Sequence, residues 1–250
     1  MRRAVFLIMV SAVAAGMFSC KKTDAELREE ALRADQKITE QSEINKEIRR
    51  LKDQLAGAQD DYNRSQIYSQ IAGLYDQKGD VNSTMKNARE AIKFQPNEYY
   101  SHYILGKAYL DAGRYGESEM ELLTSISLKN DFALSHYELG NLYYKKISYS
   151  NAISEYKKAV KLDEQCYEAY NNMGVVLGLT GKAKEAVKIL NKGIAVKPDF
   201  PVFYKNLGII YDTILKKRND AVENYNKYLE LRPDCPERKT VEAWIELIGR

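Results

Sequence analysis

The 250-residue chain is nearly neutral and has enough apolar residues to build a core. It carries 38 Lys and Arg against 35 Asp and Glu, a formal charge of +3, and 44% of its residues are hydrophobic. The even charge argues against a nucleic-acid binder, which needs a basic excess or stripe. The apolar fraction argues against a disordered tail. Three Cys are too few for the disulfide framework of a small secreted domain.

The first nineteen residues read as an export signal. A Met-Arg-Arg start precedes an uncharged apolar run over residues 4–17, and Cys20 follows Ser19. The run is short for a bilayer span, and this order is typical of a secretory signal. A Cys at this place resembles the lipobox of bacterial lipoproteins, although the two residues before Ser19 depart from the usual pattern. The resemblance implies that residues 1–19 are removed and that Cys20 carries lipid (palmitate among its acyl chains). An ordinary secretory signal with an incidental Cys, or an uncleaved anchor, stays open.

Residues 20–60 are predicted to form a helical stalk and cap. They contain no Pro and many Glu, Lys, Arg, Gln and Ala, which favours helix. The apolar stripe slips in phase between Ile38 and Ile44, which argues against one continuous coiled coil. We therefore expect the second half to pack on the following segment and the first half to be solvated. Dimerisation through this helix stays open. The stripe of the second half is Ile44, Ile48, Leu51, Leu55 and Ala58.

A repeat of 34 residues dominates the rest of the chain. A large apolar residue followed by a small one recurs as Ile71-Ala72, Leu105-Gly106, Leu139-Gly140, Met173-Gly174 and Leu207-Gly208. Thirteen positions after each first member stands another small residue: Thr84, Ser118, Ala152, Ala186 and, displaced by one, Ala221. Small residues are needed where two helices approach closely. Turn residues divide each unit into two helices: Gly79, Gly113 and Gly181 inside it, and Pro96, Pro198 and Pro233 near its end.

This pattern resembles the tetratricopeptide repeat (TPR) family, whose unit carries W-x2-L-G-x2-Y, then A-x3-F, then P. The repeats are predicted at 65–98, 99–132, 133–166, 167–200 and 201–235, the last with one extra residue around positions 216–219. The resemblance implies an all-α, right-handed superhelix of antiparallel helix pairs, an α-solenoid. Residues 236–250 are predicted to form a capping helix with Val241, Trp244, Ile245 and Ile248 on one face.

In this family the first helix of each repeat lines a concave groove. Its groove positions, together with the Asn at the sixth position, nominate Tyr100, Tyr103, Lys107, Tyr137, Asn141, Tyr144, Asn171, Asn172, Lys205 and Asn206 as partner-binding residues. Tyr offers a large contact area, and Asn bonds to both groups of a peptide backbone. Many relatives use the same Tyr and Asn positions for packing, so that reading stays open. The far end of the groove is aliphatic, with Val175, Leu179, Val202 and Ile209.

Other chemistry is not indicated. His102 and His136 stand one repeat apart at a packing position, too far from one another to share a metal. Cys166 and Cys235 end repeats two units apart, beyond disulfide reach, although an intermolecular bond stays open. The carboxylate clamp of some chaperone-binding relatives lacks its three cations here. We therefore expect no enzyme, cofactor or metal site.

The combined prediction is a lipid-anchored scaffold or assembly factor in the bacterial cell envelope. The resemblance to lipoproteins places it at the outer membrane, facing the periplasm, with a protein or peptide partner in the groove and no nucleic acid. A small-molecule or lipid-binding accessory protein of an envelope transporter is the alternative. The sequence leaves the oligomeric state open.

Overall fold

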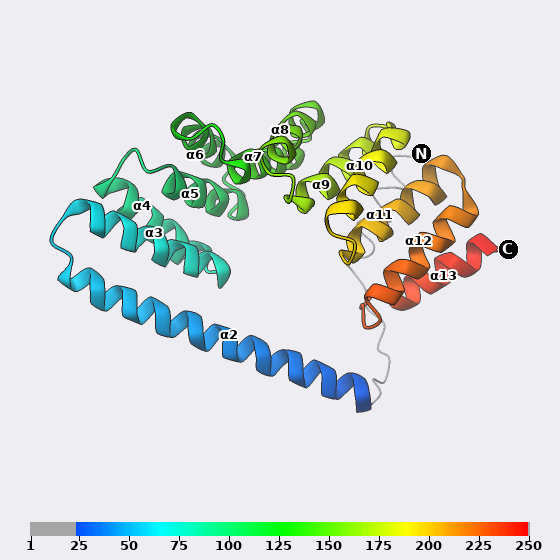
Figure 1. Ribbon diagram of the computed structural model, residues 1–250, viewed down its shortest axis with the longest axis horizontal. Coiled ribbons are helices and arrows are strands. Elements are labelled where there is room, and N and C mark those ends of the chain that lie inside the picture. Colours follow the sequence, from blue (N-terminus) through cyan, green and yellow to red (C-terminus); the bar gives the residue numbers. More distant parts are fainter. Residues whose placement is uncertain (1–23, 250) are drawn as a thin grey trace. The chain divides into compact units, whose positions relative to one another are not determined.

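The computed structural model describes residues 24–249, and their side chains from residue 35 onward. The chain forms two compact units, one ending at Lys146 and the next beginning at Ile147. The N-terminal unit contains α2 (Asp24–Gly57), α3 (Asp61–Gln77), α4 (Val81–Phe94), α5 (Tyr99–Asp111), α6 (Tyr115–Leu128) and α7 (Ala133–Lys145) (Figure 1). The C-terminal unit contains α8 (Tyr149–Leu162), α9 (Tyr167–Leu179), α10 (Ala183–Val196), α11 (Pro201–Ile210), the π-helical turn η2 (Tyr211–Leu215), α12 (Arg218–Leu231) and α13 (Arg238–Gly249). The predicted all-α fold of helix pairs is confirmed.

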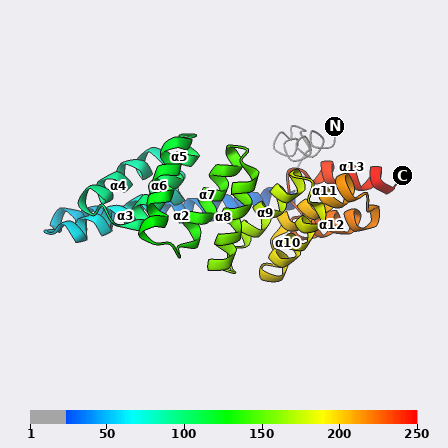
Figure 2. The same cartoon turned by 90° about the horizontal axis from the view of Figure 1, so that it is seen from above.

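Within each unit, successive helices pack as pairs. Helices α3 and α4, α5 and α6, α9 and α10, and α11 and α12 lie against one another (Figures 1 and 2). The recurring Gly explains how closely they approach. A Cβ atom on Gly174 would lie 2.6 Å from Leu190, and one on Gly208 would lie 2.5 Å from the Tyr225 ring. Because such overlap must displace the neighbouring helix, the eighth position of these repeats requires glycine.

The small residues thirteen positions beyond the apolar member are among the most deeply buried side chains of the second helices. Thr84 is 1% exposed, and Ser118, Ala152, Ala186 and Ala221 are fully buried. The core of the N-terminal unit continues from Ala72 through Leu105 and Leu122 to Leu139. The 34-residue period is therefore the period of the hydrophobic core, as expected for repeats that cannot bury an apolar face alone.

The turn inside each repeat uses a left-handed residue at one register. Gly79, Gly113 and Gly181 have φ of 71°, 73° and 81°. Ile147 and Lys216 occupy the same place with φ of 60° and 58°. The extra residue of the fifth repeat is absorbed just before Lys216, where η2 widens the helix by one residue. The insertion therefore lengthens the end of the first helix, slightly upstream of the predicted position.

Ile147 is expected to be strained, because a β-branched residue in the left-handed region costs about 1–2 kcal/mol. We expect Ile147→Gly to raise the free energy of unfolding by about 1 kcal/mol, after allowing for the greater freedom of glycine in the unfolded chain. Urea denaturation measures this change. Ile147→Ala is the control, because it shortens a side chain that is 71% exposed and keeps the Cβ atom. Equal stability of the two variants would refute the strain.

The segments at both ends of the repeats are helical. Helix α2 runs unbroken past the predicted phase slip. Ile48 and Leu51 are 5% and 2% exposed where α2 packs on α3, whereas Ile38 is 66% exposed. Helix α3 begins four residues before the predicted repeat, since the Asp60 side chain caps it by accepting a hydrogen bond from the Asn63 amide at 2.8 Å. Helix α13 buries Val241 and Ile248 next to α12.

Candidate functional site

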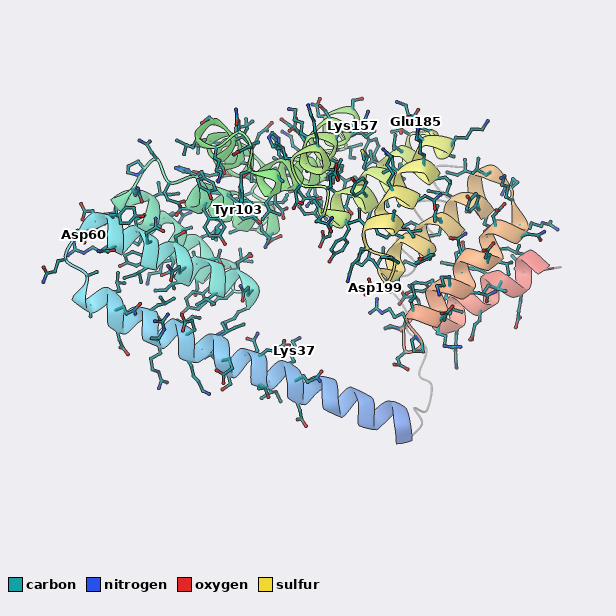
Figure 3. The ribbon with its side chains drawn as sticks, viewed as in Figure 1. Lys37, Asp60, Tyr103, Lys157, Glu185 and Asp199 are labelled. Carbon is teal, nitrogen blue, oxygen red and sulfur yellow. The ribbon has the colours of Figure 1, made fainter. Side chains whose placement is uncertain are left out.

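The first helices of the N-terminal unit bring several predicted groove residues together. The rings of Tyr100 and Tyr103 on α5 lie 5.7 Å apart, and Phe132 packs edge-on against Tyr103 at 5.2 Å. Tyr100 remains 37% exposed, whereas Tyr103 is 8% exposed. Figure 3 shows Tyr103 on the side of α5 that faces away from α6. Tyr100 therefore offers its face to a partner, while Tyr103 belongs mainly to the wall behind it.

Lys107 lies between two carboxylates. Its ammonium group donates a hydrogen bond to Asp76 on α3 and lies 3.7 Å from the Asp111 carboxylate on α5. Burial opposes the charged form of Lys107, but the bond to Asp76 outweighs it and the pKa is raised. Burial raises the pKa of the Asp111 carboxyl, with Lys107 acting against the rise. The Lys107 ammonium group therefore pairs with two carboxylates on this surface.

A third carboxylate on α7 completes this arrangement. Glu138 is only 7% exposed, and its Oε2 accepts a hydrogen bond from the Asn141 amide at 2.9 Å. Burial raises the pKa of Glu138 to about 7, although the Asn141 bond and the charge of Lys107 oppose the rise. We call Asp76, Lys107, Asp111 and Glu138 the acidic cluster. Sequence reasoning missed Glu138, which stands at the sixth position where the next two repeats carry Asn172 and Asn206.

The remaining candidates of the N-terminal unit lie on α7. Tyr137, Asn141 and Tyr144 are half-buried. Leu134, at the second position of the same helix, is 39% exposed. Tyr100 and Leu134 occupy equivalent positions of successive repeats, so the second position presents an apolar side chain to solvent in both.

In the C-terminal unit, the predicted Asn residues bind one another. The Asn206 amide donates to the Asn171 carbonyl oxygen at 2.8 Å, and the Asn171 amide donates to Asn172 at 3.2 Å. Asn171 and Asn206 are 8% and 6% exposed. This geometry joins α9 to α11 and, for Asn206, corresponds to the packing alternative.

Lys205 is engaged by the C-terminal cap. Its ammonium group lies 3.3 Å from the Glu237 carboxylate and 5.4 Å from the centre of the Tyr228 ring. The Tyr228 hydroxyl also donates to Glu237. Burial would raise the pKa of Glu237, but the bond from Tyr228 and the charge of Lys205 outweigh it and the pKa is lowered. Lys205 therefore ties α11 to the segment that leads into α13.

The aliphatic candidates of this unit are largely in the core. Leu179 and Ile209 are 4% and 1% exposed, and Val175 and Val202 are half-buried. Little of this aliphatic set is available to a small apolar ligand on the first-helix surface.

The two histidines fasten turns between repeats. His102 is 8% exposed, with Nδ1 2.6 Å from the Glu121 carboxylate and Nε2 2.8 Å from the Pro96 carbonyl. Burial disfavours the imidazolium, but these two acceptors outweigh it and the pKa of His102 is raised. His136 reaches the Asn130 carbonyl at 3.2 Å. Each ring therefore holds the carbonyl six residues before it, which adds a hydrogen bond to the packing predicted for this position.

Of the remaining predicted features, some lie among the described residues and others lie outside them. Cys166 and Cys235 are buried free thiols. Among the described residues, no three His, Cys, Asp or Glu side chains gather in a way that would hold a metal ion. No helix within residues 24–249 combines the length and apolar character needed to cross a bilayer. Cys20 and the leader lie outside the described residues.

Comparison with known proteins agrees with this architecture. A family model described as a tetratricopeptide repeat matches residues 99–132, 133–166 and 167–200, in the predicted register. The Hsp70-Hsp90 organizing protein 2 of Arabidopsis thaliana is 30% identical over 100 residues, 40% of this chain and 17% of that protein. This chain thus spans less than a fifth of that relative. The crystal structure of MamA is 26% identical and covers 71% of this chain and 94% of its own, with a TM-score of 0.57. PilW, a type IV pilus biogenesis factor, shares the fold at 20% identity, covering 67% and 77%, with a TM-score of 0.62.

Proposed function

Because this chain is a tetratricopeptide-repeat protein, we propose that it is a scaffold that binds a segment of a partner protein on α3, α5 and α7. The observation that carries the proposal is the exposure of Tyr100 and Leu134 at equivalent positions of two successive first helices. Exposed apolar side chains beside polar groups are typical of interaction surfaces. The name of the Arabidopsis relative also refers to the organisation of other proteins.

The charge of this surface argues against a chaperone-type tail. A terminal carboxylate needs converging cations, whereas Lys107 is already shared between Asp76 and Asp111. The partner segment is therefore of another kind.

We propose further that the scaffold works in the bacterial cell envelope, held to a membrane by lipid on Cys20 and facing the periplasm. The basic start, the short apolar run and the Cys after Ser19 support this part of the proposal. Incorporation of a fatty-acid label that is lost in Cys20→Ser would support it, and labelling that persists would overturn it.

Site-specific photo-crosslinking tests the scaffold function. A photoreactive phenylalanine analogue replaces Tyr100 on α5 or, as the matched control, Tyr115 on α6. Both Tyr residues are 37% exposed, so they differ in the helix face rather than in accessibility. We expect a discrete protein adduct from position 100 in cells and none from position 115. Equal adducts at both positions, or none at position 100, would contradict binding on the first helices.

A further inference from the structure

The acidic cluster carries more negative than positive charge in a partly buried setting. Three carboxylates from three helices surround one ammonium group, which is bound to Asp76, lies 3.7 Å from Asp111 and acts on Glu138 only through its charge. Glu138 receives a hydrogen bond from Asn141 on Oε2 only, so Oε1 has no protein donor within the described residues. Buried carboxylates without a matching cation are costly, and a cation supplied by a partner would offset that cost.

The surrounding helices do not provide that cation. Helix α3 contributes Asp76, α5 contributes Lys107 and Asp111, and the charge of Lys145 at the end of α7 lowers the pKa of Asp111. The Lys146 ammonium that follows α7 is engaged outside the acidic cluster, because it pairs with Glu119 on α6 at 2.7 Å. The charge imbalance is therefore local to the face of α3, α5 and α7.

A second observation at this face is independent of the carboxylates. The Tyr103 side chain is only 8% exposed, and its ring packs between those of Tyr100 and Phe132. Its hydroxyl is not one of the fully enclosed side-chain atoms that lack a hydrogen-bond partner in the described part of the chain, which are the Ser118 and Tyr225 hydroxyls. Burial raises the pKa of Tyr103, and the negative charges of Glu138 and Asp76 raise it further. The Tyr103 hydroxyl can accept a hydrogen bond from an incoming donor.

We infer that the partner segment carries a lysine or arginine, whose cation enters the acidic cluster beside the Tyr103 hydroxyl. Its apolar neighbours pack on Tyr100 and Leu134. This inference rests on the proposed function and specifies the partner's chemistry. A cationic side chain matches the cluster because it brings several N–H donors. The carboxylates can only accept hydrogen bonds, and the Tyr103 hydroxyl is able to accept one. A metal ion does not match, since the described acids form no metal-binding group.

Binding must then favour the ionised form of Glu138. Because the pKa of Glu138 is about 7 in the free chain, the carboxyl is mostly protonated at pH 6 and must lose its proton to meet the cation. We therefore expect affinity about tenfold weaker at pH 6 than at pH 8. Replacement of the partner's cation by an uncharged side chain of similar length should weaken binding by about tenfold or more.

The test uses the full chain and a random twelve-residue peptide display library as the probe. Peptides are retained if Tyr100→Ala abolishes their binding and Tyr115→Ala does not. For each retained peptide, the Kd is measured by fluorescence anisotropy at pH 6, 7 and 8, with its lysine replaced by norleucine or its arginine by citrulline in a second synthesis. Glu138→Gln should remove the pH dependence, and Glu119→Gln, which alters an acid on α6, should preserve it.

The outcomes separate the inference from the function on which it rests. A basic residue in the retained peptides, with the expected losses, supports both. Retained peptides without a basic residue, or an affinity independent of pH, would overturn the inference and leave the proposed function standing. A selection that yields no Tyr100-dependent peptide would count against the proposed function and the inference together.

Discussion

The Glu138→Gln variant is expected to be more stable than the native chain by about 3 kcal/mol at pH 8. The folded-state pKa of Glu138, about 7, lies above the ordinary value of 4.5. Between these two values the folded chain binds a proton that the unfolded chain has released, so the free energy of unfolding falls as the pH rises from 4.5 to 7. Glutamine keeps the acceptor for Asn141 and removes the charge. The gain should therefore be small at pH 4.5 and complete above pH 7.

Urea denaturation at pH 5 and pH 8 measures this difference. Asp111→Asn is the control, because its carboxylate belongs to the same cluster but its side chain is 48% exposed, and solvent screens it. We expect a clearly smaller gain from that variant. A loss of stability in Glu138→Gln that is equal at both pH values would show that the ionised carboxylate is satisfied by the fold. A stability gain together with weaker peptide binding would mean that this acid is kept for binding.

Removal of Glu237 is expected to loosen the C-terminal cap. Glu237→Ala leaves the Lys205 ammonium and the Tyr228 hydroxyl without their shared acceptor, at side-chain exposures of 17% for Lys205 and 10% for Glu237. We expect a loss of about 3 kcal/mol, as for other buried pairs broken on one side. Since the pKa of Glu237 is lowered, its contribution is present above pH 4.5 and is lost as the pH falls through the folded-state pKa.

Hydrogen exchange should locate this loss in α13 and the preceding turn, because terminal units of repeat proteins depend only on their neighbours. Lys227→Ala is the control, since its ion pair with Glu230 is exposed by 40% and 66% and should contribute at most about 1 kcal/mol. The double variant Lys205→Met with Glu237→Ala should recover part of the stability, as the unpaired ammonium is gone. If the hydrogen-exchange protection of α13 is the same in Glu237→Ala as in the native chain, the role assigned to this pair is contradicted.

Some of the site was predictable from residue positions alone, and some was not. The register placed Tyr100, Lys107 and Asn141 on the first helices, because the position within a 34-residue unit determines the helix face. It could not tell that Lys205 is held by Glu237, an acid 32 residues later. The register also did not identify Glu138. An acid at the sixth position differs from an ordinary surface acid only because the surrounding helices bury it.

The sequence by itself determined the period, the helix pairs and the turns of this protein. Those features depend on local spacing: a small residue where helices touch, and a left-handed residue where they turn. The tertiary structure decided which polar groups lose their water and which partners they find. Tyr103, Glu138 and His102 acquire their properties from residues on other helices, since burial and charge act through space. Short sequence patterns therefore determine the helical repeats, whereas the chemistry of the surface arises only when the helices pack.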